Sequence, residues 1–246
     1  MNFLKQHFST LLIALAVIIT GLILGKSYLS KGKPDDTVSV LGLGEESFDS
    51  DLIVWRASFS RRSYELKDAY AQLNADIRKV RSYLKSRGIN EDEMVFEAAD
   101  ISKEWSRVYD DEGNLRQTIF DGYSLNQSVK VSSKKVNVVE QTSRQVSELI
   151  DAGIELNSEA PEYYYTKLAQ LKLKMIEAAT KDARQRAEKI AENGGGSLGK
   201  LKNADMGVFQ ITAENSSEDY EWGGSFNTSS RRKTANVTIR LKYEID

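Results

Sequence analysis

The chain has 246 residues, of which 40% are apolar and 28% are charged, which is ample for one sizeable core or two lobes of one domain. Its 34 basic and 36 acidic residues nearly cancel, so net charge gives no argument for nucleic-acid binding. The absence of cysteine excludes disulfides, thiolate metal sites, cysteine nucleophiles and a lipidated cysteine anchor. The single histidine, His7, precedes an apolar N-terminal segment, so histidine catalysis and histidine metal sites are excluded from the rest.

That apolar segment predicts a membrane anchor. Residues 8–25 carry no charge, and a helix of that length spans about 27 Å, just enough for a hydrocarbon core. We predict a tail over residues 1–7, an anchor over 8–29 and a polar linker over 30–36. The apolar residues of the anchor are Leu11, Leu12, Ile13, Leu15, Val17, Ile18, Ile19, Leu22, Ile23 and Leu24. The alternative is a signal-like segment whose cleavage releases the protein into the periplasm, although small residues are poorly placed for cleavage.

The charges that flank the predicted anchor bear on its orientation. Lys5 precedes it, whereas Lys26, Lys31 and Lys33 follow it. The positive-inside rule therefore slightly favours a cytoplasmic domain, which would suit a cytoplasm-facing adaptor. Long domains cross membranes regardless of such charges, so these residues leave the orientation open.

Residues 37–246 predict an α+β domain. We expect a strand over 37–43 and a tight turn or bulge at Gly42–Gly44. Around residues 53–60, Ile53, Trp55, Ala57 and Phe59 alternate with their neighbours, which predicts a half-buried strand. A helix follows, with an apolar stripe made by Leu66, Tyr70, Leu73, Ile77, Val80 and Leu84. Residues 94–131 predict a long hairpin with its tip at Asp110–Asn114.

The C-terminal half predicts a long helix and a final strand. The helical spacing is carried by Leu168, Leu171, Met175, Ala179, Ala183, Ala187 and Ile190. Its small residues predict close packing on a sheet, and Ala183 and Ala187 are also candidate oligomer contacts. Strict alternation over 235–245 predicts a strand with one buried face. The expected fold is therefore a mixed or antiparallel sheet with long helices on one face, preceded by one transmembrane helix.

Motifs that suggest chemistry are incomplete. Gly194–Lys200 matches most of a phosphate-binding loop, but Leu201 replaces the Ser or Thr that would hold Mg²⁺, and the segment closes a helix. We interpret it as a helix stop. Clustered carboxylates fall in predicted turns, with a weak calcium site at Asp110–Asn114 as an alternative. We therefore predict no catalytic residue, cofactor or metal site. A ligand binder or hydrolase that uses carboxylates and tyrosines in a cleft is the alternative.

Residues 214–232 are rich in Ser, Asn and Gly, which predicts a mobile loop. Trp222 lies in this loop beside Gly223 and Gly224. An exposed Trp there predicts contact with a partner, another subunit or the membrane interface. Tyr220 and Phe226 belong to the same candidate contact surface.

Five segments, in order, resemble the SIMPL-domain family of bacterial YggE-like proteins. They are VSVLGLGE (38–45), LKSRGINEDE (84–93), FDGY (120–123), KDARQRAEKIA followed by Leu198-Gly199, and VTIRLKY (237–243). The resemblance covers residues 37–246. It implies an extracytoplasmic bacterial protein of mixed α/β fold that commonly self-assembles, has no established enzymatic activity and is linked to oxidative-stress defence. Many relatives carry a removable signal peptide, whereas this chain has the features of an anchored one.

The resemblance also reverses the orientation that the flanking charges favour. We therefore expect a non-enzymatic homo-oligomer on the bacterial inner membrane, with a single span and its domain in the periplasm. Its expected partners are the membrane and other copies of itself, with no nucleic acid and no identifiable small-molecule substrate. A role in envelope or oxidative-stress defence is the expected function.

Overall fold

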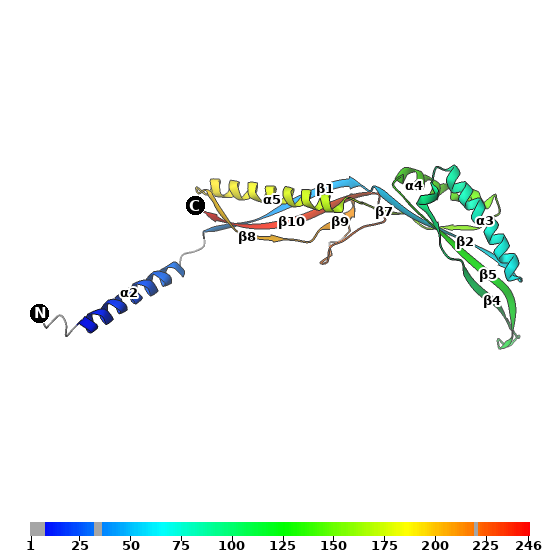
Figure 1. Ribbon diagram of the computed structural model, residues 1–246, viewed down its shortest axis with the longest axis horizontal. Coiled ribbons are helices and arrows are strands. Elements are labelled where there is room, and N and C mark those ends of the chain that lie inside the picture. Colours follow the sequence, from blue (N-terminus) through cyan, green and yellow to red (C-terminus); the bar gives the residue numbers. More distant parts are fainter. Residues whose placement is uncertain (1–7, 32–35, 219–220) are drawn as a thin grey trace. The chain divides into compact units, whose positions relative to one another are not determined.

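The computed structural model of the chain describes residues 8–31, 36–218 and 221–246, without the side chains of 8–11 and 29–31 (Figure 1). Contacts group the chain into two compact units. The first contains the residues up to 41 together with 183–205 and 240–246, and the second contains 42–182 and 206–239. The predicted tail, most of the linker, Tyr220 and the side chain of Leu11 lie outside the described residues.

The elements confirm an α+β chain with antiparallel sheets. The helices are α2 (Phe8–Lys31), α3 (Leu66–Ser86), α4 (Val136–Gln145) and α5 (Leu168–Asn193), with short 3₁₀ turns η1 (Glu91–Glu93) and η2 (Val146–Ile150). The strands are β1 (Thr37–Asp49), β2 (Leu52–Ser63), β3 (Met94–Phe96), β4 (Asp100–Tyr109), β5 (Leu115–Ser133), β6 (Leu156–Ser158), β7 (Glu162–Tyr164), β8 (Leu198–Met206), β9 (Gln210–Ala213) and β10 (Arg232–Ile245).

The helix α2 spans the predicted anchor. Its large apolar side chains between Leu12 and Leu24 are about half exposed or more. Among the residues that the structure describes, no helix combines the length and the apolar character needed to cross a membrane. The anchor therefore stays a prediction.

The larger sheet carries the main hydrophobic core. Its strand order is β3-β5-β2-β6, and β4 and β7 pair with β5 and β2 respectively. The predicted alternation in β2 is confirmed, because Ile53, Trp55, Ala57 and Phe59 are all buried. They pack with buried residues of β5, α3 and α4, and the two helices lie over this sheet in Figure 1.

The predicted apolar stripe of α3 is wrong in its first turns. Leu66 and Tyr70 are exposed, whereas Ala69 and Asp76 are buried. Asp76 occupies a core position because it pairs with Arg61 of β2, whose Nη2 donates to Oδ1 at 3.1 Å. Arg61 Nη2 also donates to the carbonyl oxygen of Gly153 at 2.5 Å. A partly buried ion pair, with its carboxylate in the core, therefore replaces an apolar contact that the spacing alone predicts.

Of the predicted turn or bulge at Gly42–Gly44, the turn is wrong, because β1 runs without a break to Asp49, and the bulge stays a prediction. Gly44 instead allows β1 and α5 to approach closely. A Cβ built on Gly44 would lie 2.3 Å from the carbonyl oxygen of Met175 and 3.2 Å from the Cβ of Ala179. Only glycine fits between the strand and the helix backbone here.

The smaller sheet has the order β1-β10-β8, and β9 also pairs with β10. The buried side chains of Ala235, Val237, Ile239, Leu241 and Tyr243 confirm the predicted alternation of β10, except that Asn236 on the opposite face is also buried. On α5 the buried residues are Leu171, Met175, Ala179, Ala183, Ala187 and Ala191. Ile190 was expected in this row but is 51% exposed. The row follows strict four-residue steps, each of which turns about 40° around the helix, so position 191 continues it and 190 does not.

Ala183 and Ala187 are fully buried within the single chain. They therefore lie in its own core and offer no surface to a second copy. At the end of α5, the amide of Gly196 donates to the carbonyl of Ala191 at 3.0 Å, Gly195 has φ +84°, and β8 begins at Leu198. This is a helix stop that leads into a strand, as predicted.

Candidate functional site

A two-stranded extension of the larger sheet forms the first candidate site. β4 and β5 pair from Asp100, which faces Asn126, to Tyr109, which faces Leu115. Pairing between β2 and β5 ends where Ser63 faces Tyr123. Residues 104–122, here called the hairpin arm, therefore continue as two strands alone (Figure 1). An isolated two-stranded hairpin is only marginally stable in water, so the arm is a segment that gains from a partner.

The arm leaves the sheet at a bulge. The register between β4 and β5 shifts between Glu104 and Trp105, where Asp121 is the additional residue. The next residue, Gly122, has φ +107°, and a Cβ there would lie 2.8 Å from the carbonyl oxygen of Ser63. A bulge with a glycine in this conformation bends its strand and increases its twist.

One face of the hairpin arm carries aromatic and apolar side chains on both sides of the pair formed by Arg107 and Thr118. Trp105 pairs with Phe120 in the register, and their rings meet edge to face at 5.5 Å between centroids. Tyr109 pairs with Leu115 on the same face. Trp105, Tyr109 and Leu115 each expose 55–56% of their surface. Exposed apolar patches of this kind mark interaction surfaces.

A groove beside the arm extends this surface. It has a volume of about 510 Å³ and is lined by Glu65, Leu66, Lys67, Tyr70, Ile101 and Tyr123. The exposed residues at the start of α3 that the helical spacing placed in the core therefore face this groove instead. The arm and the groove together make one largely apolar surface.

At the tip of the arm, the carboxylate of Asp110 is hydrogen-bonded within its own turn. Asp110 Oδ1 accepts hydrogen bonds from the amides of Glu112, at 3.1 Å, and Asn114, at 2.8 Å. Gly113 takes φ +84°, as the predicted turn requires. Asp110 thus stabilises a turn. Within residues 8–31, 36–218 and 221–246, no group of three or more His, Cys, Asp or Glu side chains is placed to hold a metal ion.

The second candidate site is the loop that contains Trp222. The side chain of buried Gln210 holds this loop: its Nε2 donates to the carbonyl of Glu221 at 2.7 Å, and its Oε1 accepts from the amide of Ser225 at 2.8 Å. Trp222 itself is fully exposed and Phe226 is partly exposed. Gln210 thus fixes the ends of a turn that presents Trp222 to solvent. The mobility of the loop as a whole stays a prediction.

Lys233 lies fully buried beneath this region, and its Nζ donates to the carbonyl of Ser230. Burial lowers the pKa of Lys233 from 10.5 to about 8, and the charge of Glu218 opposes this shift only in part. Below pH 8 Lys233 is therefore charged in the folded chain, which then bears the full free-energy cost of burying this charge.

This burial predicts a pH-dependent stability. Between pH 8 and 10.5 the unfolded chain binds more protons at this lysine than the folded chain, so its contribution to stability rises with pH. In urea unfolding of the full chain in detergent, the wild type should gain stability from pH 7.5 to 9.5 relative to Lys233→Met. The exposed Lys181→Met should follow the wild type. Parallel profiles for wild type and Lys233→Met would contradict the prediction.

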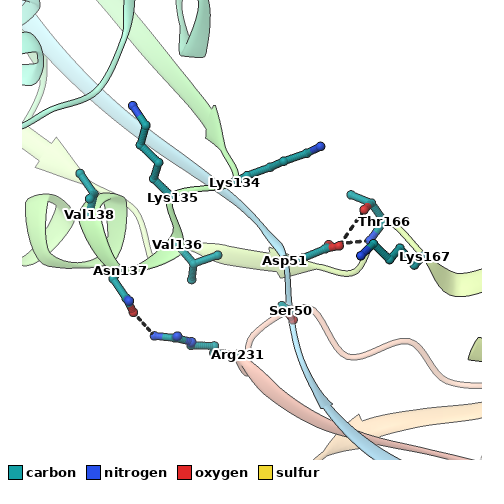
Figure 2. Close-up of a pocket in the computed structure, with 10 residues that line it drawn as sticks. All are labelled: Ser50, Asp51, Lys134, Lys135, Val136, Asn137, Val138, Thr166, Lys167 and Arg231. Carbon is teal, nitrogen blue, oxygen red and sulfur yellow. Dashed lines mark hydrogen bonds between the residues drawn. The ribbon is translucent and has the colours of Figure 1, made fainter.

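The third candidate site is a polar pocket of about 530 Å³, shown in Figure 2. Four segments supply its walls: the β1–β2 junction, the start of α4 with the two residues before it, the turn before α5 and the residue before β10. Its lining residues are Ser50, Asp51, Lys134, Lys135, Val136, Asn137, Val138, Thr166, Lys167 and Arg231. Four of the ten are cations and one is an anion.

Several of these charges have partners within the chain. Asp51 accepts hydrogen bonds from the amide and the hydroxyl of Thr166, each at 2.7 Å (Figure 2). Lys135 Nζ donates to the carbonyl of Gly88 at 2.9 Å and lies 3.2 Å from Glu93 Oε2. Arg231 Nη1 donates to Asn137 Oδ1 at 2.6 Å and to Glu140 Oε2 at 3.2 Å.

The sequence did not indicate this pocket. Its residues come from segments of the chain that are far apart, and only the paired lysines at 134–135 and the basic run at 231–233 are visible as local signals. The hairpin was predicted, but its aromatic face was not. The predicted candidates Trp222 and Phe226 lie in the loop and not on the arm.

Comparison with known proteins identifies a family. A family model described as "SIMPL: Protein of unknown function (DUF541)" matches residues 38–243. A comparison with curated proteins finds no significant match. The matched range includes all three candidate sites.

Proposed function

The chain belongs to the SIMPL family, whose description assigns no function, and we propose that it is a non-enzymatic protein that self-assembles into homo-oligomers. The observation that carries this proposal is the hairpin arm. It exposes Trp105, Tyr109 and Leu115 on one face, and no other described strand pairs with the outer edge of β4. An unpaired apolar edge strand is a template for pairing with another chain.

We further propose that α2 holds the protein to the bacterial inner membrane, with the domain in the periplasm. The support is the uncharged segment 8–25 and the outward-facing apolar side chains of α2. An apolar helix without a covering layer gains from apolar surroundings.

A fusion after Asp246 tests the side of the membrane on which the domain lies. A reporter enzyme fused there should be active only if it is of a kind that works in the periplasm. Activity only in the cytoplasm would instead support an adaptor on the other side. A role in envelope or oxidative-stress defence belongs to the same proposal.

Self-assembly through the arm predicts a mass change in a double variant. Mass photometry of the full chain in detergent at micromolar concentration should show oligomers for the wild type. Trp105→Ser combined with Leu115→Ser should shift the particles towards monomers, because a few buried aromatic and aliphatic anchors carry most interface energy.

Leu173→Ser provides the matched control. Leu173 is 69% exposed on α5, so its replacement removes an exposed leucine side chain outside the arm. The control should keep the mass of the wild type. A wild type that is strictly monomeric would contradict self-assembly, and an oligomer that survives the double variant would exclude the arm as its interface.

A further inference from the structure

The polar pocket of Figure 2 contains the start of α4, which is open to an anion. No side chain caps this helix, and its first turn contains no acidic residue. Helix geometry leaves the amides of Val136 and Asn137 without an intrahelical acceptor. Such amides, together with the helix dipole, favour negative charge at this position.

A second observation in the same pocket is independent of the helix. Ser50 lines the pocket, is only 5% exposed and has a hydroxyl oxygen with no hydrogen-bond partner among the described residues. Buried hydroxyls nearly always have a partner. An orphaned hydroxyl and uncapped amides in the lining of one pocket therefore point to a ligand that accepts hydrogen bonds from both.

The charges around the pocket favour an anion. In the described part of the chain, the side-chain ammonium groups of Lys134 and Lys167 form no hydrogen bond or ion pair. Lys135 and Arg231 are balanced by Glu93 and Glu140, and Asp51 is engaged by Thr166. The two unpaired lysines are thus the cations available to a ligand. The negative charge of Asp51 in the same lining reduces the net electrostatic attraction between the pocket and an anion.

We propose that this pocket binds a phosphate group through the α4 amides, the Ser50 hydroxyl and the ammonium groups of Lys134 and Lys167. A volume of about 530 Å³ leaves room for an organic substituent on the phosphate. The group is therefore supplied either by a soluble phosphate or phosphomonoester, or by a phospholipid headgroup. The site is formed by one chain and does not depend on self-assembly.

The test is the line broadening of inorganic phosphate in ³¹P NMR, with the full chain in detergent at constant ionic strength. The wild type should broaden the signal in a saturable way. Lys134→Gln combined with Lys167→Gln should weaken binding about tenfold or more, because hydrogen bonds to charged groups are lost. Lys181→Gln combined with Lys200→Gln changes the net charge equally outside the pocket and should bind as the wild type does.

Ser50→Ala distinguishes a site with defined hydrogen bonds from a nonspecific attraction of phosphate to lysine charges. It should weaken phosphate binding several-fold, yet leave the melting temperature without phosphate unchanged or higher, because an unsatisfied hydroxyl is removed. Displacement of phosphate by short-chain phosphatidic acid in mixed micelles would identify a lipid source. Failure of that lipid to compete would identify a soluble source.

Three results would overturn the proposal. One is the absence of saturable broadening by the wild type. Another is equal weakening in the pocket variant and in the Lys181/Lys200 control. The third is unchanged affinity in Ser50→Ala.

Discussion

Gly44→Ala should lower the free energy of unfolding by about 3 kcal/mol or more, at or above the upper end of ordinary overpacking, which is about 1–3 kcal/mol. The new Cβ would lie 2.3 Å from the carbonyl oxygen of Met175, so a backbone atom and not a flexible side chain must move. In a domain of this size the melting temperature should fall by about 6–12 °C. Thermal unfolding followed by circular dichroism measures this shift.

Gly223→Ala is the matched control. A Cβ at Gly223 would meet no atom within 4 Å, so the same chemical change should alter stability by only about 0.5 kcal/mol or less. Equal melting temperatures for Gly44→Ala and Gly223→Ala would show that β1 does not lie against α5 as described.

Arg61→Met should destabilise the chain by about 3–5 kcal/mol, because it leaves the buried carboxylate of Asp76 without its counter-charge. It also removes the hydrogen bond to the carbonyl of Gly153. Urea unfolding measures the loss. The double variant Arg61→Met/Asp76→Leu should recover most of the stability, because an apolar pair of similar volume replaces a largely buried ion pair at little net cost.

Arg78→Met controls for the loss of an arginine. Arg78 lies on the exposed side of α3, so its replacement should change stability by only about 0.5 kcal/mol or less. Failure of the double variant to recover stability would show that Arg61 contributes through interactions other than its pair with Asp76.

Periodicity predicted those elements in which one face of a regular structure is buried. The alternation in β2 and β10 was read correctly because a strand places successive side chains on opposite faces. On α5 the same reasoning failed only at Ile190, since a row with four-residue steps drifts around the helix and reaches Ala191 instead. On α3 it failed at Asp76, because a charged residue enters a core only with a partner that the local sequence does not reveal.

The candidate sites depend on long-range placement, which local patterns do not contain. The local sequence predicts a turn at Gly44, because the helix that approaches it follows more than a hundred residues later. The polar pocket joins segments near positions 50, 134, 166 and 231. The aromatic face of the arm depends on the bulge at Asp121, which sets which side chains of β4 and β5 share a face.

The most direct test of assembly through the hairpin arm is cross-linking at one introduced cysteine, because the chain has none of its own. Lys103→Cys lies on the face of β4 that carries Trp105, just before the arm. Glu177→Cys on the exposed side of α5 is the control. With a short thiol-specific cross-linker and the full chain in detergent, Lys103→Cys should form covalent dimers in high yield, and Glu177→Cys should form few. Equal yields from the two variants would contradict assembly through the arm.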